Sequence, residues 1–240
     1  MITLERSNDR KVTTLASRDG KQSKLKNTFG LTQWASCPGR TPACDACYVR
    51  KNPYPAVDAL LARNYATLLA SDYATMVALI DGMIMVFETE CERKGADKAF
   101  RIHWSGDFYS VEYARAWSVV IALHPDVEFW AYTRSFHGDV NVVDILADLP
   151  NLHLYLSVDA GNRQHVVAAK RGRKSVHLAY LATTFAEGKA DMREITGKPG
   201  MSCQQAARKL PMITTAGGAC ITCAVCPEGK ADVVFSVTKK

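Results

Sequence analysis

Apolar residues recur along the chain at two spacings, and these spacings predict two kinds of secondary structure. Stretches with an apolar residue at every third or fourth position indicate amphipathic helices, whereas short, nearly continuous apolar runs indicate buried strands. Helices are predicted over residues 55–69, 72–94, 110–124 and 140–149. Strands are predicted over residues 29–36, 99–108, 127–135, 152–161, 175–183 and 232–238, with a weaker candidate over residues 211–217.

About six strands alternate with helices in this pattern. Such an order is typical of a mainly parallel sheet, because the crossover connections place helices over its faces. The predicted fold class is therefore α/β, with the sheet either open or closed into a barrel. The length of 240 residues suits one domain. We expect residues 1–28 to form a polar N-terminal segment of loops and one or two strands, and residues 29–240 to form a single α/β domain whose Cys-rich C-terminal part spans residues 203–227.

Polar residues stand at the predicted carboxyl ends of three strands. In parallel α/β sheets, whether open or closed, ligands bind beyond these ends. The candidate cofactor-binding residues are Ser105, Gly106, Asp107, Arg134, Ser135, Ser157 and Asp159. The alternative interpretation is that each group forms a helix cap or a turn. Three groups at equivalent positions, together with a Cys-rich loop after the first strand, favour a binding site.

The composition narrows the class of protein. With 48% hydrophobic residues, the chain has enough apolar material for a core, which excludes a mainly disordered chain. No apolar run reaches the length of a membrane span, and the first residues, MITLERSNDRK, lack the apolar region of a secretory signal. We therefore expect a cytoplasmic protein without membrane contact. The formal net charge of +6 permits attraction to anions without requiring it.

Eight cysteines are unusual in a reducing compartment, where clustered cysteines more often bind metals or act in catalysis than form disulfides. Seven of them form two groups. The first cysteine group is Cys37, Cys44 and Cys47, and the second cysteine group is Cys203, Cys220, Cys223 and Cys226. Two further residues, Cys91 in a helical stretch and His103 in an apolar strand, are expected to lie in the core.

The spacing of the second cysteine group favours an iron-sulfur cluster. Its Cys-x2-Cys-x2-Cys run ends in Cys226-Pro227 and has the cysteine spacing of the bacterial ferredoxin motif. Four thiolates would close a cluster, whereas the three thiolates of the first cysteine group would leave one iron open to a substrate. Three alternatives stay open: zinc held by four cysteines, zinc held by three cysteines and one of the six histidines, or one cluster that takes ligands from both groups.

Two features together resemble a known superfamily. A Cys-rich loop with an aromatic residue beside its last cysteine (Cys47-Tyr48) precedes a Ser105-Gly106-Asp107 turn and about six βα units, and this order resembles the partial barrel of radical S-adenosylmethionine enzymes. The stretches SCPGRTPACDACY, RIHWSGDF and CITCAVCP are more specifically similar to bacteriophage proteins described as gene-product-88-like. The resemblance covers most of residues 29–235.

The resemblance implies a partial or distorted (β/α) barrel and a set of ligands. The first cysteine group would hold a [4Fe-4S] cluster whose open iron binds S-adenosylmethionine, and the second cysteine group would hold a second cluster. Ser105 to Asp107 would meet the amino group of this cofactor, and Arg134 or Ser135 would face its carboxylate. The sequence departs from the usual motifs, because Cys-x6-Cys-x2-Cys replaces Cys-x3-Cys-x2-Cys and Ser-Gly-Asp replaces Gly-Gly-Glu.

The sequence supports two hypotheses about function. The first is a cluster-dependent redox or radical enzyme that uses an electron donor and acts on a small molecule or a nucleic acid, in the host cytoplasm if the chain is phage-encoded. The second is a nucleic-acid-binding protein that is stabilised by zinc or a cluster and has no catalytic activity, because basic runs attract phosphates. These runs comprise Lys170, Arg171, Arg173 and Lys174, and Arg18, Lys21, Lys24 and Lys26.

Overall fold

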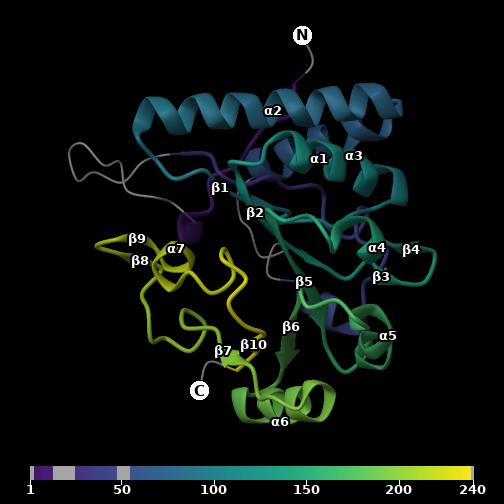
Figure 1. The fold of residues 1–240 in the computed structure, drawn as a ribbon, viewed down its shortest axis with the longest axis vertical. Helices are drawn as coiled ribbons and strands as arrows, with labels where there is room; N and C mark the ends of the chain where they lie inside the picture. The colour runs from purple at the N-terminus through teal and green to yellow at the C-terminus, as the bar shows by residue number, and fades with distance from the viewer. Residues whose placement is uncertain (1–2, 13–24, 48–54, 239–240) are drawn as a thin grey trace.

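A six-stranded parallel sheet forms the centre of the protein (Figure 1). The computed structural model describes residues 3–12, 25–47 and 55–238. The strands follow the order β1-β2-β5-β6-β10-β7, and each neighbouring pair is parallel. Their bounds are β1 Ala99–Ile102, β2 Glu128–Thr133, β5 Leu152–Val158, β6 Val176–Ala182, β7 Met201–Ser202 and β10 Val233–Ser236. The prediction of an α/β protein with about six mainly parallel strands is confirmed.

The helices alternate with these strands, and the predictions over residues 55–69, 72–94 and 110–124 are confirmed by α1, α2 and α3. Helix α2 begins after Asp72, whose carboxylate accepts a hydrogen bond from the Thr75 N–H, and it ends at Gly95, which has a φ of 60°. Both residues are typical helix caps. The bounds are α1 Pro55–Leu69, α2 Tyr73–Lys94, α3 Val111–Leu123, α4 Val143–Leu146, α5 Val166–Lys170, α6 Phe185–Thr196 and α7 Ala219–Cys223, with 3-10 turns η1 Arg10–Val12, η2 Pro42–Ala46 and η4 Arg163–His165.

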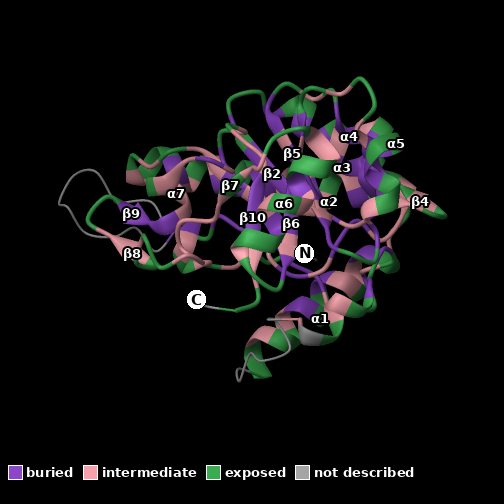
Figure 2. Cartoon of the chain, turned by 90° about the horizontal axis from the view of Figure 1, so that it is seen from below, coloured by how far each residue is buried: buried purple, intermediate pink, exposed green. Residues whose placement is uncertain are grey.

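One face of the sheet packs against helices and forms the main core. Trp117 of α3 contacts Phe100 of β1 and Phe129 of β2, with ring centroids 6.5 and 6.4 Å away. At the other end of this face, Gly188 of α6 lies so close to Val234 of β10 that a larger residue would overlap its side chain. Figure 2 shows the central strands as the most buried part of the chain. Cys91 belongs to this core, as predicted, and so does His103, which is 3% exposed.

The opposite face of the sheet is covered by the Cys-rich C-terminal segment, which includes the short helix α7. Alternate positions of the strands face it, and Tyr155, Ala179 and Val233 pack there against members of the second cysteine group. Within this segment, β8 Ile213–Thr214 pairs with β9 Gly217–Gly218 in an antiparallel hairpin. Figure 1 shows α7, β8 and β9 grouped together, apart from α3, α4 and α5, with β2 and β5 between them.

Two of the predicted elements differ in the structure. Residues 29–36 form no regular strand: the segment runs beside β1, where Phe29 N–H donates to the Arg101 carbonyl, and then turns at Trp34, which has a φ of 70°. The predicted helix over residues 140–149 is reduced to α4, because β4 Val140–Asn141 first pairs with β3 Phe136–His137.

The sheet is open in the described part of the chain. Its strand order starts at β1 and ends at β7, and no pairing joins these two strands. The structure therefore shows an open parallel sheet, and not the partial or distorted (β/α) barrel that the resemblance to radical S-adenosylmethionine enzymes implies. None of the helices in these ranges combines the length and the apolar character that crossing a bilayer requires. The weaker strand candidate over residues 211–217 corresponds to the short β8–β9 hairpin.

Candidate functional site

The carboxyl ends of β1 and β2 meet at the side chain of Asp107. This carboxylate accepts three hydrogen bonds of 2.7 Å, from the hydroxyl of Thr133 and from the backbone N–H groups of Arg134 and Phe108. Burial raises the pKa of Asp107 to about 6, although the three hydrogen bonds favour its charged form. Asp107 therefore fixes the turn after β1 against the end of β2.

A second link joins the end of β2 to the end of β5. The guanidinium of Arg134 donates to the carboxylate of Asp159, and the Thr41 hydroxyl donates to the same carboxylate oxygen at 2.6 Å. The Arg134 and Asp159 side chains are only 14% and 6% exposed. Since Thr41 immediately precedes η2, this buried ion pair ties the first cysteine loop to two strand ends.

The first cysteine loop lies directly on this network. The Gly39 backbone is so close to the carbonyl group of Arg134 that any side chain at this position would overlap it. Cys37, Cys44 and Cys47 are free and half-buried. Burial, followed by the negative charge of Asp107, raises the pKa of the Cys37 thiol to about 12. The sequence-based expectation that this loop and the strand ends lie together therefore agrees with the geometry.

The three candidate serines at the strand ends form hydrogen bonds that involve backbone carbonyl groups. The Ser105 hydroxyl donates to the Leu31 carbonyl, and the Ser135 hydroxyl donates to the Phe108 carbonyl. The backbone carbonyl of Ser157 accepts a hydrogen bond within the turn after β5. These contacts fit the alternative interpretation, in which the polar residues form caps or turns. The other four candidates lie around the first cysteine loop, namely Gly106, Asp107, Arg134 and Asp159. Tyr48, the aromatic residue after Cys47, lies outside the described residues.

A cavity of about 440 Å³, here named the loop cavity, opens beside the first cysteine loop. Its walls come from the loop, from the turn after β5, from the carboxyl end of β6 and from α6. Four carboxylates line it, those of Asp45, Asp159, Glu187 and Asp191. Part of this negative charge is balanced, because Asp159 pairs with Arg134 and Asp191 lies 3.3 Å from Arg163. The cavity is at the sheet edge where ligands of parallel sheets bind.

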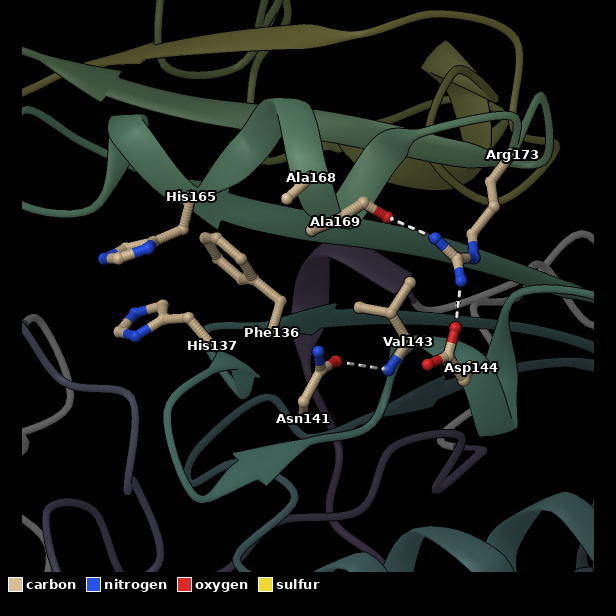
Figure 3. A pocket seen from close by; sticks show the side chains of 9 residues that line it. All are labelled: Phe136, His137, Asn141, Val143, Asp144, His165, Ala168, Ala169 and Arg173. Atoms are coloured by element: carbon tan, nitrogen blue, oxygen red, sulfur yellow. Dashed lines mark hydrogen bonds and ion pairs between the residues drawn. The ribbon is translucent and has the colours of Figure 1, made fainter.

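A smaller pocket of about 250 Å³ lies next to the same strand ends (Figure 3). The rings of His137 and His165 stack there, with centroids 4.5 Å apart. Burial, His165 and the charge of Arg134 lower the pKa of His137. On the other side of the pocket, Arg173 forms an ion pair with Asp144. The sequence identified these two histidines only as candidates for a fourth zinc ligand, because nothing in their spacing predicts that they stack.

The second cysteine group lies against the opposite sheet face. Three of its members pack against residues of the strands, namely Cys203, Cys223 and Cys226. Cys220 is the second residue of α7. Burial is the main cause that raises the pKa of Cys226 to about 12 and that of Cys220 to about 11. Other thiols of the group raise both pKa values further, so these side chains lie within electrostatic range of one another.

The donor chemistry of both cysteine groups suits a metal, because thiolates are ligands of soft metal ions. All eight cysteines are free thiols. In the part of the chain that the structure describes, no three His, Cys, Asp or Glu side chains converge as ligands of one ion. Thiols with raised pKa values stay protonated at neutral pH, and a soft metal ion would displace these protons. For Cys37 and for Cys226, the thiols that shift the pKa come from the same group.

The basic run over residues 170–174 is partly used within the fold. Lys170 lies 3.2 Å from Asp232, and Arg173 pairs with Asp144, whereas Arg171 and Lys174 are exposed. In the other run, Lys26 is exposed, and Arg18, Lys21 and Lys24 lie outside the described residues. The nucleic-acid hypothesis therefore stays a prediction, with two of its residues already engaged in ion pairs.

Comparisons with known proteins place the sequence among phage proteins. A family model described as Gene product 88 matches residues 2–229. Two curated proteins, each named Gene 88 protein, come from Mycobacterium phages L5 and D29 and are 38% and 39% identical over 248 aligned residues, which cover the whole of both chains. No solved structure matches the sequence. The resemblance to gene-product-88-like proteins is confirmed, and none of these matches points to radical S-adenosylmethionine enzymes.

Proposed function

The chain belongs to the Gene product 88 family of phage proteins, and we propose that it is an iron-sulfur protein with two separate [4Fe-4S] centres and a redox or radical-type enzyme activity. One observation carries the proposal. Seven free cysteines fall into a group of three at the carboxyl edge of the sheet and a group of four on the opposite sheet face. Thiolate sets of this size are those that hold such clusters.

The first centre is the proposed catalytic one. Three thiolates leave one iron of a four-iron cluster without a protein ligand. The loop cavity is lined by Ala43 and Asp45, the two neighbours of Cys44 in the chain. When bound, the cluster supplies one-electron chemistry. The residues of the chain position the loop: Asp107 fixes the strand ends, and the pair of Arg134 with Asp159 holds Thr41 at the start of η2. The cluster ligands would therefore sit on a rigid base.

The proposed cofactor of this centre is S-adenosylmethionine. Its sulfonium and ammonium groups are cationic, and the loop cavity has the carboxylates of Asp45 and Glu187 in its lining. Opposite charges favour such a ligand in a partly enclosed site. The substrate, a small molecule or a nucleic acid, would enter from the same edge. Formation of 5'-deoxyadenosine after reduction of the holoprotein with dithionite tests this step, and an intact cluster that forms none would reject the cofactor but keep the metal centre.

Iron and sulfide analysis of protein purified without oxygen tests the metal centres. We expect about eight iron atoms and eight sulfides per chain. Replacing the first cysteine group by serine should remove about half of the iron, and replacing the second should remove the other half. The matched control is Cys91→Ala, since Cys91 is a core cysteine outside both groups and this variant should keep all the iron. Zinc without iron or sulfide would overturn the proposal, and loss of all iron in each group variant would reject separate centres.

A further inference from the structure

The pocket in Figure 3, here named the histidine pocket, has two polar ends and an apolar middle. At one end the rings of His137 and His165 stack, with an interplanar angle of 18°. At the other end Arg173 pairs with Asp144. Phe136 lies between the two ends, and its ring meets that of His137 edge-on, with the centroids 5.1 Å apart. The pocket therefore offers flat aromatic surfaces together with charged groups.

The size and the lining of the histidine pocket suit a single planar ring system. Its volume of about 250 Å³ is below the range of about 300 to 1,000 Å³ that is typical of pockets for drug-sized ligands. Val143, Ala168 and Ala169 complete its apolar middle, against which the face of a ring would pack. The side-chain oxygen of Asn141 accepts from the Val143 N–H at 3.1 Å, so the NH2 group of the same amide can donate to a polar ring edge. Apolar faces and polar edges are the character of a nucleobase, which proteins bind by stacking and by hydrogen bonds to its edges.

The basic run over residues 170–174 supplies cations beside this pocket. Arg173 of the run lines the pocket itself. Arg171 and Lys174 are exposed, and in the part of the chain that the structure describes neither of them forms an ion pair, unlike Lys170 and Arg173. Exposed guanidinium and ammonium groups attract phosphate groups. The pocket and the basic run therefore point to the same kind of ligand, a flat base that carries a phosphate.

We propose that the histidine pocket binds a nucleotide, whose base packs in the pocket and whose phosphate lies near Arg171 and Lys174. The nucleotide is either free or one unit of a single-stranded nucleic acid, because a base must be unpaired to enter such a pocket. The inference is independent of the proposed metal centres, since none of its residues belongs to either cysteine group. A nucleotide in this pocket would lie at the carboxyl edge of the sheet, on which the first cysteine loop also lies.

Titrations of the purified protein with adenosine monophosphate and with a short, labelled oligodeoxyadenylate test the inference. His165→Ala removes the exposed ring of the histidine stack, and we expect it to weaken the binding of the probe about tenfold, an effect of the size that loss of one base-stacking ring has. The matched control is His153→Ala. His153 lies on β5 beside Glu128 and outside the pocket, so this variant should bind as tightly as the wild type.

The salt dependence of binding tests the phosphate contacts separately. For the oligonucleotide, the double variant Arg171→Gln and Lys174→Gln should reduce the slope of log affinity against log salt concentration by about 1.4, which is about 0.7 for each lost phosphate contact to a single strand. The matched control is Arg193→Gln with Lys198→Gln, which removes two other exposed cations, in α6 and just after it. This control should leave the slope unchanged.

The two probes distinguish the two sources of the nucleotide. Binding of adenosine monophosphate supports a site for a free nucleotide, and binding of the oligonucleotide alone supports a site for a single strand. A wild-type protein that binds neither probe would overturn the inference. An affinity that His165→Ala leaves unchanged, or that His153→Ala lowers equally, would overturn it as well, because binding would then not involve the pocket.

A measurement on the wild type avoids any dependence on the folding of variants. In NMR spectra of nitrogen-15-labelled protein, the bound probe should shift the imidazole signals of His137 and His165, whereas those of His153 and His177 should stay constant. Unchanged signals of the stacked pair at saturating probe would reject the pocket as the binding site. Protein that binds the probe but contains no iron would reject the proposed metal centres and leave this inference standing.

Discussion

The two cysteine groups occupy different environments on one sheet. The first lies at the carboxyl edge, where its loop is held by the buried pair of Arg134 with Asp159 and borders the loop cavity. The second lies on a sheet face, where aromatic rings and the hydroxyl of Tyr155 hold its segment. In this protein the edge borders a cavity that a ligand could occupy, whereas the strand residues of the face pack against the C-terminal segment. The comparison supports the proposal that a ligand binds at the edge and not on the face.

The largest effect is expected from Arg134→Met, which removes the charged anchor of the edge region. Asp159 would stay buried without its cation, and we expect the free energy of unfolding to fall by about 3 kcal/mol. Urea unfolding measures the change. Arg63→Met is the matched control, because Arg63 and Glu5 form an exposed pair, and it should cost about 0.5 kcal/mol. Equal losses in the two variants would contradict a buried anchor at the edge.

A second test concerns the close approach of the first cysteine loop to the end of β2. In Gly39→Ala the new methyl group would overlap the Arg134 carbonyl, and the backbone cannot move aside as a flexible side chain would. We expect a loss of about 2 kcal/mol in unfolding free energy. Gly82→Ala, in the middle of α2 and without neighbours near its added methyl group, should instead stabilise the protein by about 1 kcal/mol. A neutral Gly39→Ala would show that the loop does not need this contact.

The sequence predicted the main elements of the fold because their apolar periodicity is strong. It missed α6, whose residues are mostly polar, although the capping box of Thr184 and Glu187 marks its start. The prediction of a strand over residues 29–36 was wrong because an apolar run shows burial and not strand pairing. Phe29 and Leu31 are buried, but their N–H groups contact the neighbouring segment through single backbone hydrogen bonds to Arg101 and Ser105.

The candidate site could be predicted in part. Residues at the ends of parallel strands lie at one edge, which correctly brought Asp107, Arg134 and Asp159 together. Sequence spacing does not tell which of these side chains pair, so the anchoring role of Thr41 was missed. It also does not tell which segment covers the second sheet face, and the packing of Tyr132 and Cys226 in one cluster therefore had no signal in the sequence.

Acid sensitivity should come from the helix-covered core, through His103. Burial lowers the pKa of His103 from 6.5 to about 3, so between these values the unfolded chain binds a proton that the folded protein does not. The contribution of His103 therefore lowers the free energy of unfolding by about 1.4 kcal/mol for each pH unit below 6.5. His103→Asn keeps a residue that tolerates the φ of 58° and should remove this slope. Urea unfolding at pH 4.5, 5.5 and 6.5 measures this dependence. An equal loss of unfolding free energy per pH unit in the wild type and in His103→Asn would contradict the role of His103.

The smallest effect is expected on the sheet face, from Tyr155→Phe. The ring would still pack, and only the hydroxyl shared by the Val225 and Ala231 carbonyls would be lost, so unfolding should become easier by about 1 kcal/mol. The control is Tyr109→Phe, since the buried Tyr109 hydroxyl has no hydrogen-bond partner among the described residues and its removal should be neutral or slightly stabilising. If Tyr155→Phe instead cost as much as Arg134→Met, hydrogen bonding and not apolar packing would hold the C-terminal segment, and the contrast between a charged edge and an apolar face would fail.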